Sequence, residues 1–230
     1  EQCRLWPLGP AGAALTGSVP IDGSLPGRVF QTVRPLPSDA EGLHRLWLPL
    51  MDGHDRVGVL EVRVGTPAEL YDPGLREECR WLAELVGSLV ASMGQYGDAL
   101  QRPRLTRPRT PSAELLWQLL PPLTAGSGPF VLAGILEPAY EAGGDAFDYS
   151  LSEATVSLAA FDAMGHGLSA AVLVAAAVSA YRSARRDGRG VHDQARALDE
   201  VVAGTFPGSS FVTGVLAELD VPSGRLRYVN

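Results

Sequence analysis

The chain has 230 residues, 46% hydrophobic and 20% charged, which suits a folded protein of one large or two small domains and excludes global disorder. Its net charge at pH 7 is −7, and its sequence contains no lysine. This acidic balance argues against a nucleic acid as the main partner, because proteins that bind nucleic acids usually present a basic face.

Cysteine usage and hydropathy bear on location. Cys3 and Cys79 lie far apart and form no metal-binding or disulfide pattern, so a reducing, cytoplasmic environment is expected. No apolar run approaches the ~20 residues of a membrane span, so no membrane partner is expected. The chain begins without methionine and ends in "GRLRYVN", which has the pattern of a strand, so it is expected to be a fragment of a longer protein.

Residues 1–74 are predicted to be mostly β. Two β-rich runs, Leu46 to Leu50 and Val57 to Val64, flank an Asp52-Gly53 turn signal. Alternating β-formers on both sides of such a turn predict a hairpin.

A long connecting helix is predicted over residues 75–100. Its apolar residues step by four and three for three heptads, and they are Leu75, Cys79, Leu82, Val86, Leu89, Met93 and Tyr96. The rhythm fits two arrangements: an amphipathic helix packed on its own domain, or the helix of a parallel homodimer formed through residues 75–96. The sequence leaves both open.

An Arg- and Pro-rich segment, residues 101–111, has no apolar periodicity and is predicted to be a linker. The second domain, residues 112–230, opens with a short helix and continues as strand, strand, helix, helix, strand, strand. This order predicts an α+β fold in which helices are layered on an antiparallel sheet.

Three aspartates lie in residues 143–167 of the second domain, a stretch otherwise made mostly of small and apolar residues. Asp162 ends an apolar run, and Asp145 follows two glycines near the start of the preceding strand. If the two strands pair antiparallel, these acids meet beside a helix N-terminus, in an arrangement that suits a hard cation such as Mg²⁺ or Mn²⁺. In a simpler interpretation Asp162 caps the helix, and alternation makes Asp148 an outward polar residue of its strand.

Four separated motifs resemble those of the bacterial SpoIIE-type branch of the metal-dependent (type 2C, PPM) serine/threonine protein phosphatases. They run in unbroken order through residues 112–230: "LLPPL", "AGILEPAYEAGGDAFDY", "LAAFDAMGHGLSAAVLVAAAVSAYR" and "FVTGVLAELDVPSGRLRYVN". The resemblance implies a PPM-type α-β-β-α sandwich, truncated at its C-terminus. It also implies hydrolysis of phosphoserine or phosphothreonine on a regulatory protein such as an anti-sigma factor antagonist.

The resemblance further implies a centre of two Mn²⁺ or Mg²⁺ ions. By its motifs, Asp145 is a metal ligand, Asp162 bridges both ions, and the backbone carbonyl of Ala163 is a neighbouring ligand. Asp148 matches the second acid of the GGDxxD pattern and is a further candidate ligand.

His166 corresponds to a histidine that is proposed as a general acid in eukaryotic relatives. Two extra residues separate it from the aspartate here, so a role in packing the turn is equally open. The family's remaining aspartates lie beyond Asn230, so the chain as given is expected to bind metal weakly or not at all.

Residues 1–74 are similar to the C-terminal part of a GAF sensory domain, on the segments "VPIDGSLPGRVFQTVRPL" and "RLWLPLMDGHDRVGVLEVRV". The resemblance implies a partial GAF-like α/β domain that binds a small molecule and regulates the phosphatase through the long helix. Two other functions stay open: a degenerate, non-catalytic phosphatase-like module that binds its partner in a partner-switching pathway, and a protein whose main role is sensing.

Overall fold

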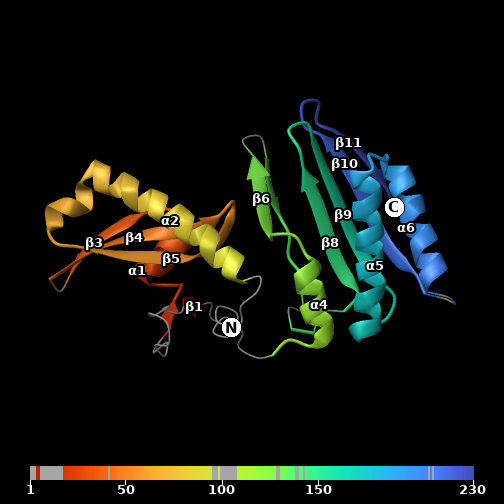
Figure 1. Cartoon of the computed structure of the whole chain (residues 1–230), viewed down its shortest axis with the longest axis horizontal. Coiled ribbons are helices and arrows are strands. Elements are labelled where there is room, and N and C mark those ends of the chain that lie inside the picture. The colour runs from red at the N-terminus through yellow and green to blue at the C-terminus, as the bar shows by residue number, and fades with distance from the viewer. Residues whose placement is uncertain are drawn as a thin grey trace. The chain divides into compact units, whose positions relative to one another are not determined.

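The computed structural model divides into two compact units, Glu1–Thr106 and Arg107–Asn230, and each has a hydrophobic core of its own (Figure 1). Of the predicted linker, residues 101–107 lie outside the described part of the chain. The structure describes residues 4–5, 18–40, 42–94, 98, 108–127, 130–137, 140–141, 143–206, 208 and 210–230.

The first unit is built on a three-stranded antiparallel sheet in the order β3 (Leu36–Ala40), β4 (Leu43–Asp52) and β5 (Asp55–Val64). The predicted hairpin is confirmed as β4–β5, and Gly53 supplies the left-handed backbone of its turn with φ 57°. The remaining short elements are β1 (Arg4–Leu5), β2 (Val19–Pro20), α1 (Leu25–Thr32) and the 3-10 helix η1 (Pro67–Tyr71).

The long helix α2 (Pro73–Gly94) packs on this sheet. Its buried side carries Cys79, Ala83 and Gly87, so packing on its own domain, one of the two predicted arrangements, is confirmed. The predicted heptad seam is not a single exposed stripe: Leu75, Cys79 and Val86 pack toward the sheet, whereas Leu82, Leu89 and Met93 are exposed. Tyr96 lies outside the described residues.

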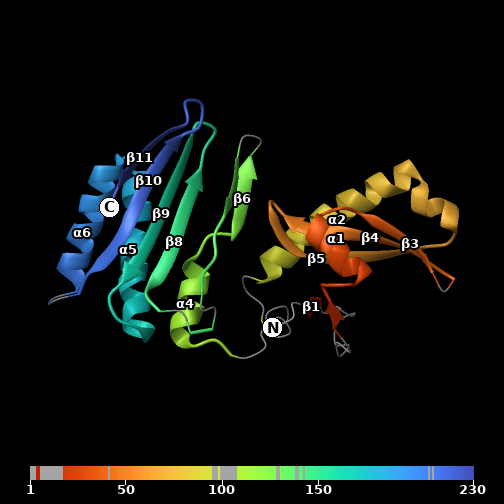
Figure 2. The same cartoon turned by 180° about the vertical axis from the view of Figure 1, so that it is seen from behind.

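The second unit contains a four-stranded antiparallel sheet in the order β11-β10-β9-β8. Helices α5 and α6 lie together on one face of this sheet, and Figure 2 shows the strands from the other side. A separate hairpin, β6–β7, precedes this sheet in the chain. The elements are α4 (Pro111–Leu119), β6 (Thr124–Ser127), β7 (Phe130–Ala133), β8 (Asp145–Leu151), β9 (Thr155–Ala163), α5 (Gly167–Arg186), α6 (Val191–Thr205), β10 (Val212–Asp220) and β11 (Arg225–Val229).

The core of this unit lies between the sheet and α5. Small residues of α5, such as Ala171 and Ala177, let the helix approach the strands, and Phe161 of β9 meets Tyr181 of α5 edge-to-face with ring centroids 5.8 Å apart. The predicted α+β class is confirmed, because helices cover an antiparallel sheet. The four-layered sandwich stays a prediction.

Helix α5 bears on the expectation drawn from hydropathy. Among the described helices it alone is long and apolar enough to cross a membrane, with a mean hydropathy of 1.3 over its best window. Half of that window is buried inside the unit, and nine residues of the helix pack in the core. Packing against the sheet therefore accounts for its apolar composition.

Candidate metal site

Asp145 and Asp162 are direct register partners across β8 and β9. Asp145 is the first residue of β8, and Asp162 is the last but one of β9, so the antiparallel hairpin places them at the same end of the sheet. Both are exposed, and no described cation pairs with either carboxylate. Two like charges placed directly opposite each other repel, and a divalent cation would relieve that repulsion.

A close backbone contact fixes this end of the hairpin. The Ala163 amide donates to the carbonyl oxygen of Gly144 at 2.9 Å. A Cβ on Gly144 would lie only 2.3 Å from the Ala163 carbonyl oxygen, so only glycine fits there. That carbonyl, the predicted backbone ligand, therefore points toward the chain that enters Asp145.

The turn after β9 leads directly into α5. Gly165 and Gly167 have φ values of 92° and 71°, in the left-handed region that glycine tolerates. The N-cap of α5 is His166, which makes no side-chain capping hydrogen bond. The simpler interpretation of Asp162 as a helix cap is therefore wrong, because the helix begins five residues later.

His166 itself is exposed at the start of α5. Its carbonyl oxygen accepts from the Ser169 hydroxyl at 3.4 Å, and its imidazole makes no hydrogen bond to any described residue. The ring is exposed four residues after Asp162. Its proposed role as a general acid stays a prediction.

Asp148 faces the other way. It is on the helix side of β8, only 3% exposed, and both its oxygens are engaged by arginines of α5. Arg182 Nη2 donates to Oδ1 at 2.7 Å, and Arg185 Nη1 donates to Oδ2 at 2.8 Å. The expectation that Asp148 points outward is wrong, because its carboxylate is buried on the helix side and each oxygen accepts from an arginine. Its role as a metal ligand stays a prediction.

The sequence alone does not reveal that Arg182 and Arg185 neutralise Asp148. They lie three residues apart, a spacing that puts two side chains on one side of a helix. Arg182 Nη2 also donates to the carbonyl oxygen of Leu119, at the end of α4, at 2.7 Å. One buried cluster therefore joins α4, α5 and β8.

Tyr181 lies beneath this cluster and is fully buried. The Arg185 guanidinium is 4.8 Å from the centroid of its ring, but the hydroxyl makes no hydrogen bond of normal geometry. Burial raises the pKa of the Tyr181 hydroxyl, and the neighbouring Arg185 charge only partly offsets that effect. Burial alone would lower the pKa of Arg185, but its contacts with Tyr181 and Asp148 raise it overall.

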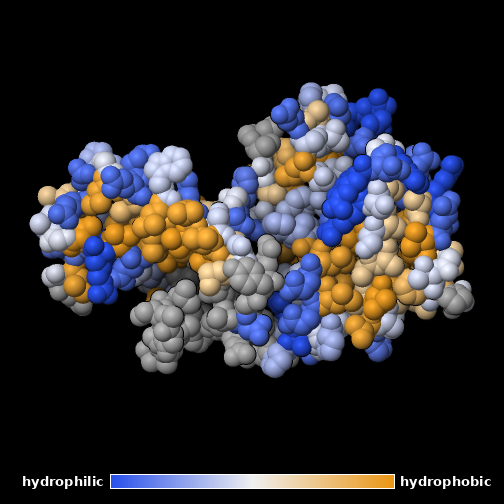
Figure 3. All heavy atoms as spheres, in the orientation of Figure 1, coloured by the Kyte–Doolittle hydropathy of each residue, from blue (hydrophilic) through white to orange (hydrophobic). Residues whose placement is uncertain are grey.

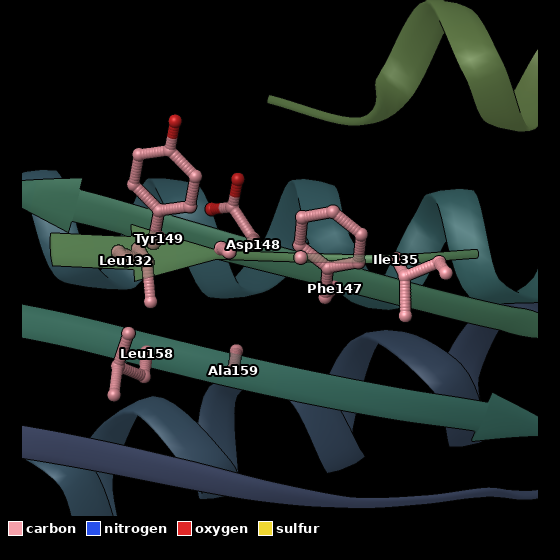
Figure 4. A pocket seen from close by; sticks show the side chains of 9 residues that line it. Leu132, Ile135, Phe147, Asp148, Tyr149, Leu158 and Ala159 are labelled. Atoms are coloured by element: carbon pink, nitrogen blue, oxygen red, sulfur yellow. The ribbon is translucent and has the colours of Figure 1, made fainter. Parts of the chain in front are cut away.

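The paired acids do not line either described pocket of the second unit, although one pocket, of about 340 Å³, includes Phe161 and Thr213 next to Asp162. A pocket of about 250 Å³ lies between β7 and strands β8 and β9 and is lined by Phe147, Tyr149 and Leu158 among others (Figure 4). Neither Asp145 nor Asp162 lines it. Within the described ranges, no three His, Cys, Asp or Glu side chains lie close enough to hold a metal ion. The Asp145–Asp162 pair is therefore an open surface site rather than a closed cage.

The fold and these residues define an α+β unit with two opposed carboxylates at the end of a hairpin, beside a glycine turn and a helix N-terminus. Residues 152–230 match the family described as Stage II sporulation protein E (SpoIIE). The matched stretch is about a third of the chain and includes Asp162 and His166, so this part of the chain is similar to a SpoIIE-type domain.

Among solved structures, the chain is similar to the RsbU and RsbW domains of Rv1364c from Mycobacterium tuberculosis. The sequences are 32% identical, the TM-score is 0.35, and the match covers 38% of this chain and 24% of that one. The chain thus spans about a quarter of the length of that relative, and a TM-score this low establishes no common fold. None of the curated proteins matches the chain.

Proposed function

We propose that residues 112–230 are part of a PPM-type protein serine/threonine phosphatase that removes phosphate from phosphoserine or phosphothreonine on a regulatory protein. The pairing of Asp145 with Asp162 carries the proposal, because it brings together two carboxylates that no described cation neutralises. The SpoIIE match over residues 152–230 supports the same class.

The donor set fits a hard cation. Asp145, Asp162 and the carbonyl oxygen of Ala163 are all oxygen donors, and Mn²⁺ and Mg²⁺ prefer such groups. When bound, such ions polarise a phosphate and generate hydroxide near neutral pH. These donors are too few for the two ions of the predicted centre, so the proposal requires further acidic ligands from the complete protein.

The residues of this chain would hold the metal ligands in position and supply a proton at that centre. The Gly144–Ala163 backbone contact holds the two carboxylates in register. His166, exposed at the first turn of α5, is the candidate general acid for the leaving serine or threonine oxygen. Asp148 fixes β8 to α5 through its ion pairs with Arg182 and Arg185.

We infer that the substrate is a phosphorylated protein of a partner-switching system, such as an anti-sigma factor antagonist. The similarity to a chain that contains RsbU and RsbW domains supports this substrate class. A GAF-like sensor in residues 1–74, a small-molecule ligand for it and a cytoplasmic location complete the proposal.

The test is an Mn²⁺-dependent phosphatase assay of the complete gene product on phosphoserine and phosphothreonine peptides. We expect turnover by the parent protein and its loss in Asp162→Ala. The matched control is Glu153→Ala, which removes an exposed acid from the β8–β9 turn and is expected to keep full activity. An active Asp162→Ala variant would refute the assignment of Asp162, and phosphoprotein binding without hydrolysis would favour the non-catalytic module.

A further inference from the structure

Large apolar side chains form an exposed stripe along α2 in the first unit. The α2 stripe consists of Trp81, Leu82, Leu85, Leu89 and Met93, which are 65%, 47%, 60%, 53% and 46% exposed. At about 100° per residue, these positions share one side of the helix. Figure 3 shows hydrophobic side chains gathered along this helix.

The described residues of the first unit do not bury this stripe. The side of α2 that packs on the sheet carries Cys79, Ala83 and Gly87, all buried. The approach is close: a Cβ on Gly87 would lie 2.1 Å from the carbonyl oxygen of Met51. Because this contact fixes the rotation of α2, the α2 stripe stays on the outside of the unit.

The size of the stripe matches one half of a small specific interface. Five large side chains that are each about half exposed present on the order of 500 Å² of apolar surface. That is as large as the biggest apolar patch of a typical monomer, about 300–600 Å². Two such stripes together would bury about 1,000 Å², close to the lower limit for a stable protein interface.

We propose that the α2 stripe is covered by the same stripe of a second copy, with the two α2 helices antiparallel. The spacing of the stripe is helical, so another helix of the same pitch is the surface that fits it. Each copy supplies such a helix. This inference concerns the first unit and does not depend on the phosphatase activity.

The charge pattern favours the antiparallel direction. Glu78 precedes Leu85 by seven residues, which puts it within about 20° of the line of the stripe. Parallel helices would place the two Glu78 carboxylates against each other, at a cost in free energy. Antiparallel helices that pair Leu85 with Leu89 of the second copy avoid this, and they bring Trp81 to Met93, a favourable sulfur–aromatic pair.

The mass of the chain in solution tests the dimer. Analytical ultracentrifugation should show a dimer at micromolar concentration, and Leu85→Glu should weaken it at least tenfold. Arg80→Glu is the matched control, because Arg80 is exposed on the same helix outside the stripe. Circular dichroism checks that both variants fold. A monomeric parent chain, or a Leu85→Glu variant that still dimerises like the parent, would overturn the proposal.

Cysteine cross-linking tests the direction. The Trp81→Cys/Met93→Cys double variant should form covalent dimers with a short bifunctional maleimide, above the background set by the native Cys3 and Cys79. Trp81→Cys alone should stay at background, since antiparallel helices keep the two copies of position 81 about 18 Å apart along the axis. Efficient dimers from Trp81→Cys alone would refute the antiparallel arrangement.

Discussion

Asp145 and Asp162 face each other as register partners at the end of the β8–β9 hairpin, and neither carboxylate has a described cationic partner. A sheet gains nothing in stability from two like charges in this position, because opposed like charges on neighbouring strands are destabilising. The pair is therefore best explained by a function that needs negative charge at this point.

Removing one of the two charges should stabilise the metal-free chain. We expect Asp162→Asn to raise the free energy of unfolding by about 0.2–1 kcal/mol, the range for a cross-strand charge pair. Urea unfolding in the presence of a chelator measures this change. Glu153→Gln, which removes an exposed acid from the adjoining turn, should change stability by less than about 0.5 kcal/mol. A clear loss of stability in Asp162→Asn would show that the pair is not repulsive.

Gly144→Ala should separate the two acids. The new Cβ would be 2.3 Å from the Ala163 carbonyl oxygen, so the start of β8 must move away from β9. We expect a loss of about 1–3 kcal/mol of stability, typical of overpacking, and lower phosphatase activity in the complete protein. Gly143→Ala is the control, because no atom lies within 4 Å of its Cβ position and its φ is not in the left-handed region. Equal effects of the two variants would contradict this account.

The opposition of Asp145 and Asp162 could be predicted from the sequence because it depends only on local features. Two strands joined by a short turn pair antiparallel, so the start of one meets the end of the other. Strand alternation could not place Asp148, because β8 has apolar residues on both sides, Ala146 on one and Phe147 on the other. Its partners, Arg182 and Arg185, lie more than 30 residues away and become neighbours only through packing.

The heptad pattern of α2 was ambiguous for a geometric reason. Its 4,3 steps follow a line between the buried side of the helix and the exposed α2 stripe, so neighbours along the seam, such as Cys79 and Leu82, end in different environments. Sequence periodicity measures spacing but not the direction in which a helix is turned. The packing of Gly87 on Met51 sets that direction, and no local pattern reveals it.

Asp148 should contribute strongly to the free energy of unfolding. Asp148→Asn removes the charge that neutralises two partly buried arginines, whose side chains are 24% and 14% exposed. We expect the free energy of unfolding to fall by about 3 kcal/mol, the lower end for breaking a buried ion pair. Asp187→Asn, which breaks an exposed pair with Arg189, should cost less than about 1 kcal/mol.

A comparison of variants separates the contribution of charge to stability from that of packing in the Asp148–Arg182–Arg185 cluster. The triple variant Asp148→Leu/Arg182→Met/Arg185→Met should lose less stability than Asp148→Asn, because it leaves no charge unpaired. Denaturant unfolding of each variant supplies the numbers. If Asp148→Asn were as stable as the parent but bound Mn²⁺ more weakly, the carboxylate would be a metal ligand after all.

Tyr181 should make stability fall at alkaline pH. Its pKa is raised by burial above the ordinary value of about 10, so the folded state holds the phenol proton more tightly than the unfolded state. The resulting stabilisation is fully present below pH ~10 and is lost as the pH rises from there through the folded-state pKa. The chain has no lysine, so the other side chains that titrate in this window are the remaining tyrosines and the cysteines, and burial also raises the pKa of the Cys79 thiol.

Urea unfolding at pH 9 and at pH 11 measures this loss of stability. Tyr181→Phe should lose less stability than the parent between the two values. At neutral pH it should be at least as stable, because the substitution removes a buried hydroxyl that makes no hydrogen bond of normal geometry. Tyr228→Phe, at a residue that is 66% exposed, should follow the parent at both pH values. A Tyr181→Phe variant with the same loss as the parent would show that the buried phenol does not titrate on unfolding.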